Sequence, residues 1–384
     1  APYLIPTMPS SSAVMRLLLP SVLPLLALAQ QPAPEFTIDL DLPADQRHRE
    51  VARRFKGDYP NFMAAWEISL ARRLSPEERA EWVANSNIKQ EFQDEIRGFV
   101  EEIDHPQVTF ERLVLFNLMY ELNYPTFCSG VLVADASGRV VHGRNLDFWM
   151  NFKSSATSRS VMELAVNLTY TRNGTAAYNA HSVAGYVGLH TAVKLGGQRR
   201  WSFQQNSHYS NDRKLNLAAM KSGAVPFGFY IRELIDQDVD FRTAVSRIET
   251  TRFGAPNFFL MAGQGTWEGA SIEIDRNFSD PIANLDHVQV LAPQIGRWFL
   301  VQTNDRIWDE PQDDRRPAAL EMLKLFGGPA KINEENVMHM MRSKPLYNDY
   351  TSLSMVAVPA TGYVKAITGK ESYPTVNLLA KNRR

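Results

Sequence analysis

The residues most able to do chemistry are a lone cysteine and two charged residues that the following hairpin brings back beside it. Cys128 is the only cysteine among 384 residues and stands at the start of a predicted strand. The return strand carries Arg144 and Asp147 in the run His-Gly-Arg-Asn-Leu-Asp. A reactive thiolate requires nearby positive charge, and an amine acting as a base requires an anion to orient it. The three residues therefore predict nucleophilic catalysis, set against a buried core cysteine beside an ordinary hairpin ion pair.

The composition excludes several other classes of protein. Lys and Arg number 41 against 42 Asp and Glu, for a net charge of -1, and 44% of the residues are hydrophobic. These values argue against a disordered chain and against a polyanion or nucleic-acid binder. One cysteine allows neither an intrachain disulfide nor a cysteine zinc cluster, and the eight histidines show no HxH or HExxH spacing. We therefore expect no metal and no cofactor, which argues against a metal-dependent lipase or amidase.

The first residues predict a secretory leader. Met15 and Arg16 precede an apolar run over 17–28 that ends in a small-x-small triplet, so we expect a signal peptide cleaved after Ala29. Residues 1–29 then lie outside the fold. Three candidate glycosylation sequons follow, at Asn167, Asn173 and Asn277. Together these features predict a protein of the secretory pathway, lysosomal or extracellular.

The chain changes character near Cys128. Residues 30–127 carry 11 Lys and Arg against 18 Asp and Glu, a balance of -7, whereas residues 128–384 carry 29 against 24, a balance of +5. The first part is predicted to be mostly helical and the second rich in strands. Opposite charges would let the two parts attract each other as well as pack. We expect an α+β fold of sheets layered with helices.

Hydrophobic periodicity and turn residues give the predicted elements. Helices are predicted over 44–56, 61–74, 76–102, 106–122, 229–236, 241–251, 313–326 and 334–342. Strands are predicted over 36–42, 128–134, 139–145, 161–172, 175–181, 186–194, 258–262, 270–275, 288–292, 298–303 and 351–358. Ser75, followed by Pro76 and two glutamates, is a strong helix start. The 106–122 helix is apolar on most faces, so it is either buried or in contact with lipid.

Ordered motifs from Cys128 onward resemble the acid ceramidase and N-acylethanolamine acid amidase family of N-terminal-nucleophile hydrolases. The resemblance covers nearly all of the chain after the leader, including the 36–43 strand. The motifs that carry it are Phe127-Cys128-Ser129, His142 to Asp147, Ala184 to Gly188, Gly296-Arg297-Trp298, Gln302-Thr303-Asn304 and Asp313 to Arg316.

The resemblance implies a four-layer αββα N-terminal-nucleophile fold and a precursor that cuts itself between Phe127 and Cys128. Residues 30–127 would form a helical α-subunit and residues 128–384 a sheet-rich catalytic β-subunit. Cys128 would then carry both the nucleophilic thiol and a free α-amine that acts as general base. Because no second cysteine exists, the two subunits would stay together non-covalently.

The resemblance also assigns roles to four further residues. Asp147 would orient the amine, and Arg144 would contact the nucleophile or polarise the site. Asn304 would donate a hydrogen bond to the oxyanion, and Arg315 would assist both self-cleavage and catalysis. Without the resemblance, Arg315 reads as a surface ion pair at the start of a helix.

The sequence departs from the family pattern at several positions. Ser129 and Gly130 replace the usual Thr-Ser, a small insertion at 123–125 precedes the cut, and Asp305 replaces a tyrosine. The family's catalytic glutamate has no clear counterpart: Ser207 falls at its position, and Asp212 is the nearest carboxylate.

The implied substrates are long-chain fatty-acid amides, either ceramide or N-acylethanolamines, cleaved at acidic pH. We expect the 106–122 helix and the aromatic residues Trp149, Phe152 and Trp201 as candidates for an apolar groove, or as core. Transient contact with a membrane surface or a lipid-presenting activator protein is expected for delivery of such lipids. Phe62, Trp66 and Phe92 are candidates for the membrane contact, but their helical spacing favours the core. Two alternatives stay open: a non-catalytic secreted lipid-binding protein, and another N-terminal-cysteine hydrolase of bile-salt or penicillin-type amides.

Overall fold

The computed structural model describes residues 32–368 and 378–379, except 125, 149, 155–156, 198, 210 and 277–286. The predicted signal peptide, Trp149 and the Asn277 sequon therefore lie outside the described residues. The side chains of 151–160, with Phe152 among them, are likewise outside the description.

Two large sheets dominate the described part of the chain. An eight-stranded sheet has the order β1-β6-β7-β8-β9-β10-β11-β12, a five-stranded sheet has the order β13-β2-β3-β14-β15, and β4 pairs with β5. The strands are β1 (Glu35–Asp39), β2 (Thr126–Ala134), β3 (Val140–Phe148), β4 (Asn151–Ser154), β5 (Thr157–Ser160), β6 (Ala165–Arg172), β7 (Thr175–Val183), β8 (Thr191–Lys194), β9 (Trp201–Ser207), β10 (Asn257–Gly263), β11 (Gly269–Ile274), β12 (Val288–Val290), β13 (Phe299–Gln302), β14 (Thr351–Val358) and β15 (Tyr363–Thr368).

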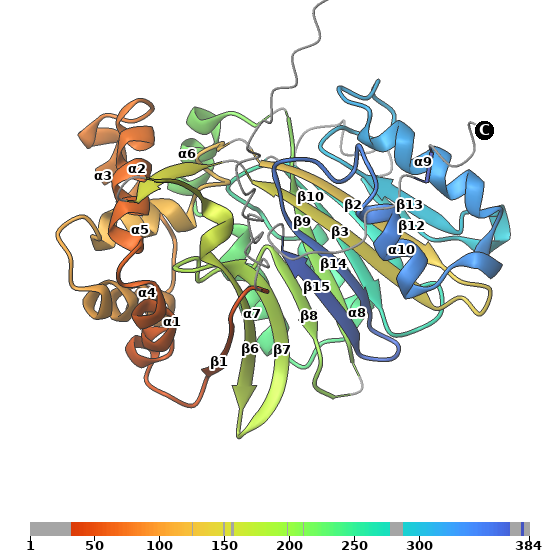
Figure 1. The fold of residues 1–384 in the computed structure, drawn as a ribbon, viewed down its shortest axis with the longest axis horizontal. Helices are drawn as coiled ribbons and strands as arrows, with labels where there is room; N and C mark the ends of the chain where they lie inside the picture. The colour runs from red at the N-terminus through yellow and green to blue at the C-terminus, as the bar shows by residue number, and fades with distance from the viewer. Residues whose placement is uncertain are drawn as a thin grey trace, which may run out of the picture.

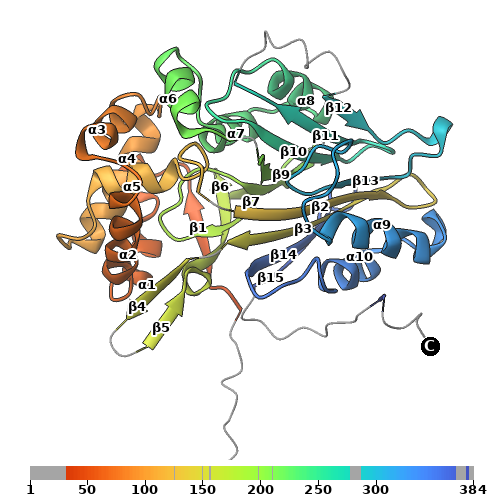
Figure 2. The same cartoon turned by 90° about the horizontal axis from the view of Figure 1, so that it is seen from above.

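Helices cover the outer faces of both sheets. They are α1 (Arg49–Phe55), α2 (Tyr59–Ala71), α3 (Pro76–Ala84), α4 (Gln90–Ile103), α5 (Phe110–Asn117), α6 (Arg213–Lys221), α7 (Phe227–Asp236), α8 (Phe241–Glu249), α9 (Arg315–Phe326) and α10 (Glu334–Met341). Helix α8 contacts β10 and β11 of the larger sheet, whereas α9 and α10 contact β13, β3 and β14 of the smaller sheet. The sheets face each other through β2, β9 and β10. The layers seen in Figures 1 and 2 therefore run helix, sheet, sheet, helix, as predicted.

Each strand of the smaller sheet divides its side chains between two cores. Val131 and Val133 of β2 point outward to Met322 of α9 and Met338 of α10. The alternate residues, such as Leu132, point inward and pack with Leu260 of β10. This period of two places Cys128 on the inner face with Leu132.

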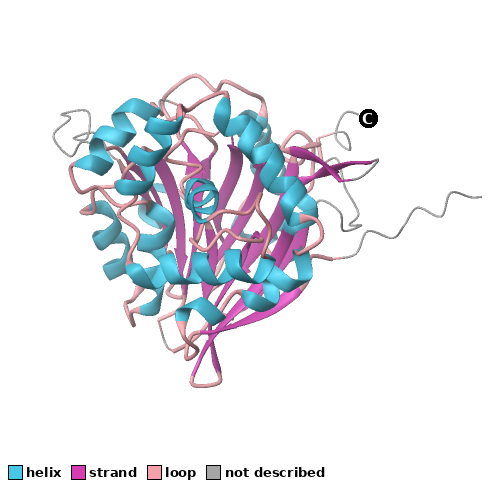
Figure 3. Cartoon of the chain, turned by 90° about the vertical axis from the view of Figure 1, so that its left-hand side faces the viewer, coloured by secondary structure: helices cyan, strands magenta, loops and turns pink. Residues whose placement is uncertain are grey.

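The helices before Cys128 pack against one end of the sheets, and Figure 3 shows them in front of the strands. The side chains of Phe62, Trp66 and Phe92 are at most 3% exposed. Of the two alternatives for these residues, core is therefore confirmed and membrane contact is excluded, because they belong to the core that joins these helices to the larger sheet. Trp201 is also fully buried, and its indole N–H donates to the carbonyl of Val239.

The Gly-Tyr-Val-Gly motif after β7 holds the helical half in place. Asn117 of α5 donates to the carbonyl of Gly185 at 2.8 Å and accepts from the N–H of Val187 at 2.7 Å. Gly185 has φ +82°, and a Cβ there would lie 1.9 Å from the hydroxyl oxygen of Tyr59. Glycine is required at this position for both reasons.

Charges also join the two halves. Arg232 of α7 and Glu95 of α4 form a fully buried ion pair. Lys89 pairs with Glu233 at the surface. The negative charge lies in the helical half in the first pair and in the strand-rich half in the second. The attraction between the net charges of the two halves therefore stays a prediction.

Three predicted helices are shorter or divided in the structure. The predicted helix over 44–56 is divided into a 3-10 helix over 44–46 and α1. The predicted helix over 76–102 is divided into α3 and α4, because Asn87 takes φ +51° and its side-chain amide donates to the carbonyls of Met220 and Ala224. The Ser75 start is confirmed by a capping box with Glu78. The predicted helix over 106–122 shrinks to α5, which begins after the Thr109 cap. Its apolar residues are buried, except Phe110, which is partly buried and packs against the same core, so they are not in contact with lipid.

Several strands differ from the prediction. Residues 161–164 form a short 3-10 helix, and 186–190 precede β8 rather than belonging to it. Strands β4, β5, β9 and β15 and helix α6 are absent from the prediction. Among the described residues, no helix is both long and apolar enough to cross a membrane.

Candidate active site

The β2–β3 hairpin places Cys128 deep in the protein. Cys128 lies opposite Leu146, Phe127 opposite Asp147, and Gly130 opposite Arg144. Alternation along the strands therefore puts Cys128 and Arg144 on the inner face. The Cys128 side chain is fully buried, whereas that of Phe127 is 37% exposed. The Phe127–Cys128 peptide bond thus lies where a strand passes from the surface into the space between the sheets.

Asn304 holds the backbone nitrogen of Cys128. It lies just beyond the end of β13, the strand next to β2, and its Oδ1 accepts from the Cys128 N–H at 3.0 Å. Its Nδ2 donates to the carbonyl of Ser207 at 2.6 Å. The side chain is fully buried, and both ends of its amide are engaged. In the uncut chain Asn304 therefore orients the nitrogen of the predicted scissile bond.

Arg315, the first residue of α9, holds the other side of Cys128. One terminal nitrogen donates to the Cys128 carbonyl at 2.7 Å and the other to Oδ1 of Asn304 at 2.9 Å. The Asp313 carboxylate accepts a hydrogen bond from the same guanidinium at 2.7 Å. The guanidinium carbon lies 5.7 Å from the centre of the Phe127 ring. Arg315 is thus no surface ion pair, because it is buried and contacts both sides of the junction.

Arg144 is fully buried beside the thiol. One of its terminal nitrogens donates to the carbonyl of Gln205 at 2.7 Å. Among the described residues, its Nε and second terminal nitrogen have no hydrogen-bond partner. Unpaired buried donors are costly, so this guanidinium has capacity left for a substrate or intermediate.

Asp147 is held by hydroxyl and amide donors. Its two carboxylate oxygens accept from Thr351 at 2.7 Å and from Asn348 at 2.9 Å, and Arg315 lies 3.7 Å away. Burial raises the pKa of Asp147, although these three neighbours act in the opposite direction. In the strand register Asp147 lies opposite Phe127, the residue before the predicted scissile bond. A free α-amine on Cys128 would need an anion in this place.

The environment keeps the thiol protonated in the uncut chain. Burial raises the pKa of Cys128 above its ordinary value. Arg144 and Arg315 lower the pKa, whereas the negative charge of Asp147 raises it. A protonated thiol is a weak nucleophile, so a base must take up its proton when it attacks.

The two substituted residues after Cys128 fit this site. The hydroxyl of Ser129 accepts from Arg315 at 3.4 Å. A Cβ at Gly130 would lie 2.4 Å from Nε2 of Gln204 on the facing strand β9, so a larger residue there would displace that buried side chain.

Strand β9 supplies functional contacts that the sequence prediction missed. Gln205 receives the hydrogen bond from Arg144, and Ser207 receives the one from Asn304. The Ser207 hydroxyl lies 2.5 Å from that of Thr126, two residues before Cys128. Ser207 stands at the position of the family's glutamate. Because β9 lacks an alternation of polar and apolar residues, the sequence did not predict this strand or the contacts of Ser207.

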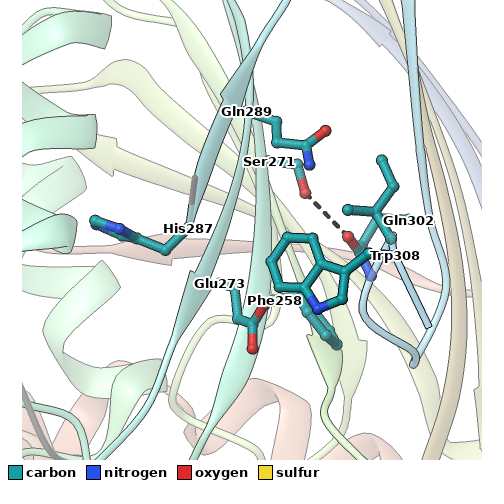
Figure 4. Close-up of a pocket in the computed structure, with 8 residues that line it drawn as sticks. Phe258, Ser271, Glu273, His287, Gln289, Gln302 and Trp308 are labelled. Carbon is teal, nitrogen blue, oxygen red and sulfur yellow. Dashed lines mark hydrogen bonds between the residues drawn. The ribbon is translucent and has the colours of Figure 1, made fainter. Parts of the chain in front are cut away.

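The loop that follows Asn304 is fixed from its outer side. Arg306 donates to Glu273 of β11 at 2.5 Å, and His208 lies 3.2 Å from the same carboxylate. A small pocket lies beside this contact, and Figure 4 shows Gln302 reaching Ser271 across it. Its lining is formed by Phe258, Ser271, Glu273, His287, Gln289, Gln302, Ile307 and Trp308.

Two of the three predicted glycosylation sequons, Asn167 and Asn173, lie among the described residues. Asn173 is exposed in the β6–β7 turn with φ +50°. Asn167 is partly buried within β6, and its Oδ1 lies 2.8 Å from Nδ1 of His181. Within the described ranges, no three His, Cys, Asp or Glu side chains come together as a metal site would require.

Comparisons with known proteins agree on one group. The chain is 29% identical over 339 residues to acid ceramidase of Macaca fascicularis, covering 83% of this chain and 82% of that protein. It is 28% identical over 348 residues to N-acylethanolamine-hydrolyzing acid amidase of Rattus norvegicus, covering 86% and 87%. The solved structure of the Caenorhabditis elegans ortholog of that amidase matches with a TM-score of 0.51 at 26% identity, covering 61% of this chain and 93% of the other. No protein-family model matches the chain.

Proposed function

Because the chain belongs to the family of acid ceramidases and N-acylethanolamine-hydrolyzing acid amidases, we propose that it is an amidase of fatty-acid amides that activates itself by cutting before Cys128. One observation carries the self-cleavage proposal. Asn304 binds the N–H of Cys128 and Arg315 binds its carbonyl, so two residues distant in sequence converge on the single cysteine. Any buried strand residue needs partners for its backbone groups, but here the partners are an amide and a guanidinium side chain, which bind each other as well.

The proposed division of the chain follows from the cut. Residues 30–127 form the α-subunit and 128–384 the β-subunit, with 1–29 removed as leader and upstream sequence. Asn117, Tyr59 and the Glu95–Arg232 pair hold the two together without a covalent bond. We further propose that the protein enters the secretory pathway and works in an acidic compartment or outside the cell. No metal or cofactor takes part in the proposed chemistry.

The cut would give Cys128 a free α-amine beside its own thiol. The amine, with an ordinary pKa of about 7.7 to 8.0, would take the thiol proton as the sulfur attacks the substrate carbonyl. Asn304 already accepts from this nitrogen, and Asp147 supplies the nearby negative charge. These contacts would keep the amine beside the thiol.

Hydrolysis then proceeds in two halves. The carbon–nitrogen bond of the substrate breaks, the amine leaves with the transferred proton, and the acyl group stays on sulfur as a thioester. Water hydrolyses the thioester to a fatty acid and restores the thiol. The unpaired donors of Arg144, together with the second N–H of the Asn304 amide, would bind the negative oxygen that forms in each half, and one such donor can be worth about 3 kcal/mol.

The proposed substrates are fatty-acid amides. Whether the enzyme prefers ceramide or N-acylethanolamines is decided by the substrate assay below. Relatives named for ceramide and for N-acylethanolamines match this chain almost equally, at 29% and 28% identity. Such amides dissolve poorly in water, so delivery from a membrane surface or a lipid-presenting protein belongs to the proposal as well.

The test follows the intact mass of the purified secreted protein at about pH 4.5 and at neutral pH, with Cys128→Ala as the control. Two fragments that meet at Phe127 and Cys128, absent from the control, are expected. The cut protein is then assayed with ceramide, N-palmitoylethanolamine and a bile-salt amide. A chain that stays whole under every condition would refute self-activation, and turnover of the bile-salt amide alone would refute the substrate class.

A further inference from the structure

We propose that the hydroxyl groups of Thr126 and Ser207 form a positioning pair that holds the Phe127–Cys128 peptide for self-cleavage. The inference rests on the self-cleavage in the proposed function. It assigns a task to a residue that stands where the family's glutamate is missing. Ser207 and Thr126 are positioning residues here, because neither supplies the atoms that react.

Thr126 is the last inward-facing residue before the scissile bond. Residues 126 and 128 share one face of β2, so the Thr126 and Cys128 side chains both point toward the larger sheet. Thr126 is 3% exposed, whereas Phe127 between them points out to the surface. Thr126 is therefore the side chain through which the core can hold the amino-terminal side of this bond.

Ser207 ends β9 and faces both sides of the junction. Its hydroxyl oxygen lies 2.5 Å from that of Thr126, and its carbonyl accepts from Asn304 at 2.6 Å. Asn304 in turn binds the N–H of Cys128. Ser207 thus connects Thr126, which precedes the scissile bond, to the Asn304 side chain, which binds the Cys128 nitrogen. Gln205 Nε2 donates to the Ser207 hydroxyl at 3.4 Å, which leaves that hydroxyl able to donate to Thr126.

The chemistry explains why the strand must be held on both sides. The Cys128 sulfur bonds to the Phe127 carbonyl carbon, the bond from that carbon to the Cys128 nitrogen breaks, and the thiol proton ends on the amine. Water then hydrolyses the thioester, which gives the Phe127 carboxyl group and the free thiol. Within an extended strand this attack requires a fixed local geometry, and a small displacement lowers the rate steeply.

The proposal predicts which step depends on the pair. Removing either hydroxyl loosens the carbonyl side of the bond. Ser207→Ala leaves the hydroxyl of buried Thr126 without this partner, and Thr126→Val leaves the Ser207 hydroxyl with Gln205 alone. Ser207→Ala and Thr126→Val should each slow self-cleavage about tenfold, the factor expected for one lost buried hydrogen bond. The double variant should be little slower than either single variant, because both remove the same contact. Ser207→Thr, which retains a hydroxyl, should recover most of the rate.

The experiment uses the full secreted chain at about pH 4.5 and measures the rate at which the two fragments appear by intact mass. Thr169→Val is the matched control, since it removes a part-buried hydroxyl hydrogen bond to Asn179 at a distance from the junction. Melting temperatures are measured on uncut protein made in the Cys128→Ala background. A slowing found at Ser207 and Thr126, absent from Thr169→Val and unrelated to melting temperature, is the expected result.

Other outcomes would overturn the proposal. Rates equal to wild type, additive losses in the double variant, or slowing that only follows lost stability would each refute the positioning pair while leaving self-cleavage intact. If Ser207→Ala does not fold, Thr126→Val against Thr126→Ser gives the same comparison from the other hydroxyl. A wild-type chain that is never cut would refute the proposed function, and this inference with it.

Discussion

Glu121 is a buried carboxyl group whose titration should leave a measurable mark on stability. It lies seven residues before Cys128 and is 1% exposed. Its Oε1 accepts from the N–H of Phe227, the first residue of α7, at 3.2 Å. Burial raises the pKa of Glu121 to about 7, although this backbone hydrogen bond acts in the opposite direction.

The sign of the effect follows from linkage. The carboxyl binds its proton more tightly in the folded chain than in the unfolded chain, where its pKa is about 4.5. Its stabilising contribution is therefore fully present below pH 4.5 and is lost as the pH rises through 7. The shift amounts to about 3 kcal/mol of unfolding free energy, at about 1.36 kcal/mol per pH unit.

Other buried groups act against this trend in the whole protein. Burial lowers the pKa of His142 and of His181 to about 4. Both therefore reduce the unfolding free energy of the protein as the pH falls from their unfolded pKa of 6.5 toward 4. The comparison must therefore be between two variants at each pH. Glu121→Gln retains the acceptor for Phe227 and removes the titration.

The assay is urea unfolding at several values between pH 4.5 and 7.5, in the uncut Cys128→Ala background. The unfolding free energy of Glu121→Gln, relative to the parent, should rise by about 3 kcal/mol toward neutral pH. Glu81→Gln, which alters an exposed carboxylate of the same half, is the matched control. Parallel curves for Glu121→Gln and its parent would refute the reasoning, because Glu121 would not then titrate in this range.

Three further predictions concern packing and modification. Glu95→Gln leaves Arg232 buried without its counter-charge and should cost about 3 to 5 kcal/mol in unfolding free energy, measured by urea. Gly130→Ala forces a methyl group between the sheets and should cost about 1 to 3 kcal/mol by the same measurement. Asn173→Gln should remove one glycan from the secreted protein, whereas Asn167→Gln should leave its mass unchanged except for the substitution, because that partly buried side chain lies in a strand paired on both sides.

Each of these predictions has a control and a contrary result. Lys89→Ala breaks an exposed ion pair and should cost less than about 1 kcal/mol, so an equal loss at Glu95 would contradict the burial argument. Gly57→Ala has open space around the new methyl group and should be nearly neutral, and a neutral Gly130→Ala would mean that the sheets can separate. Loss of a glycan from Asn167→Gln would show that β6 is accessible when the glycan is added.

The hairpin at Cys128 could be predicted because its information is local. Alternating apolar residues, the turn at 135–138 and the return strand set a register in which Arg144 and Asp147 must lie near Cys128. The same local signals gave the Ser75 capping box and strand β14 at their observed residues. The division between helical and strand-rich parts also followed from periodicity alone.

Strand β9 shows where such reasoning fails. Gln204, Gln205 and Asn206 are fully buried, so the segment lacks the alternation of polar and apolar residues that marks a half-buried strand. Their hydrogen bonds go to partners far along the chain, such as His142 and the Gln302 carbonyl. Nothing near them in sequence signals that these polar groups will be satisfied.

By itself, the sequence determined the hairpin at Cys128 and the layered α+β class, and it led to Cys128 as the proposed nucleophile and, by resemblance, to Asn304 and Arg315 as proposed site residues. Only the tertiary structure decided that those two residues meet Cys128 from 176 and 187 positions away. It also decided that Phe62 and Trp66 serve as core and that Ser207 lies against Thr126. The physical reason is that side-chain periodicity encodes which face of an element is buried, whereas the partner of that face depends on how whole layers pack.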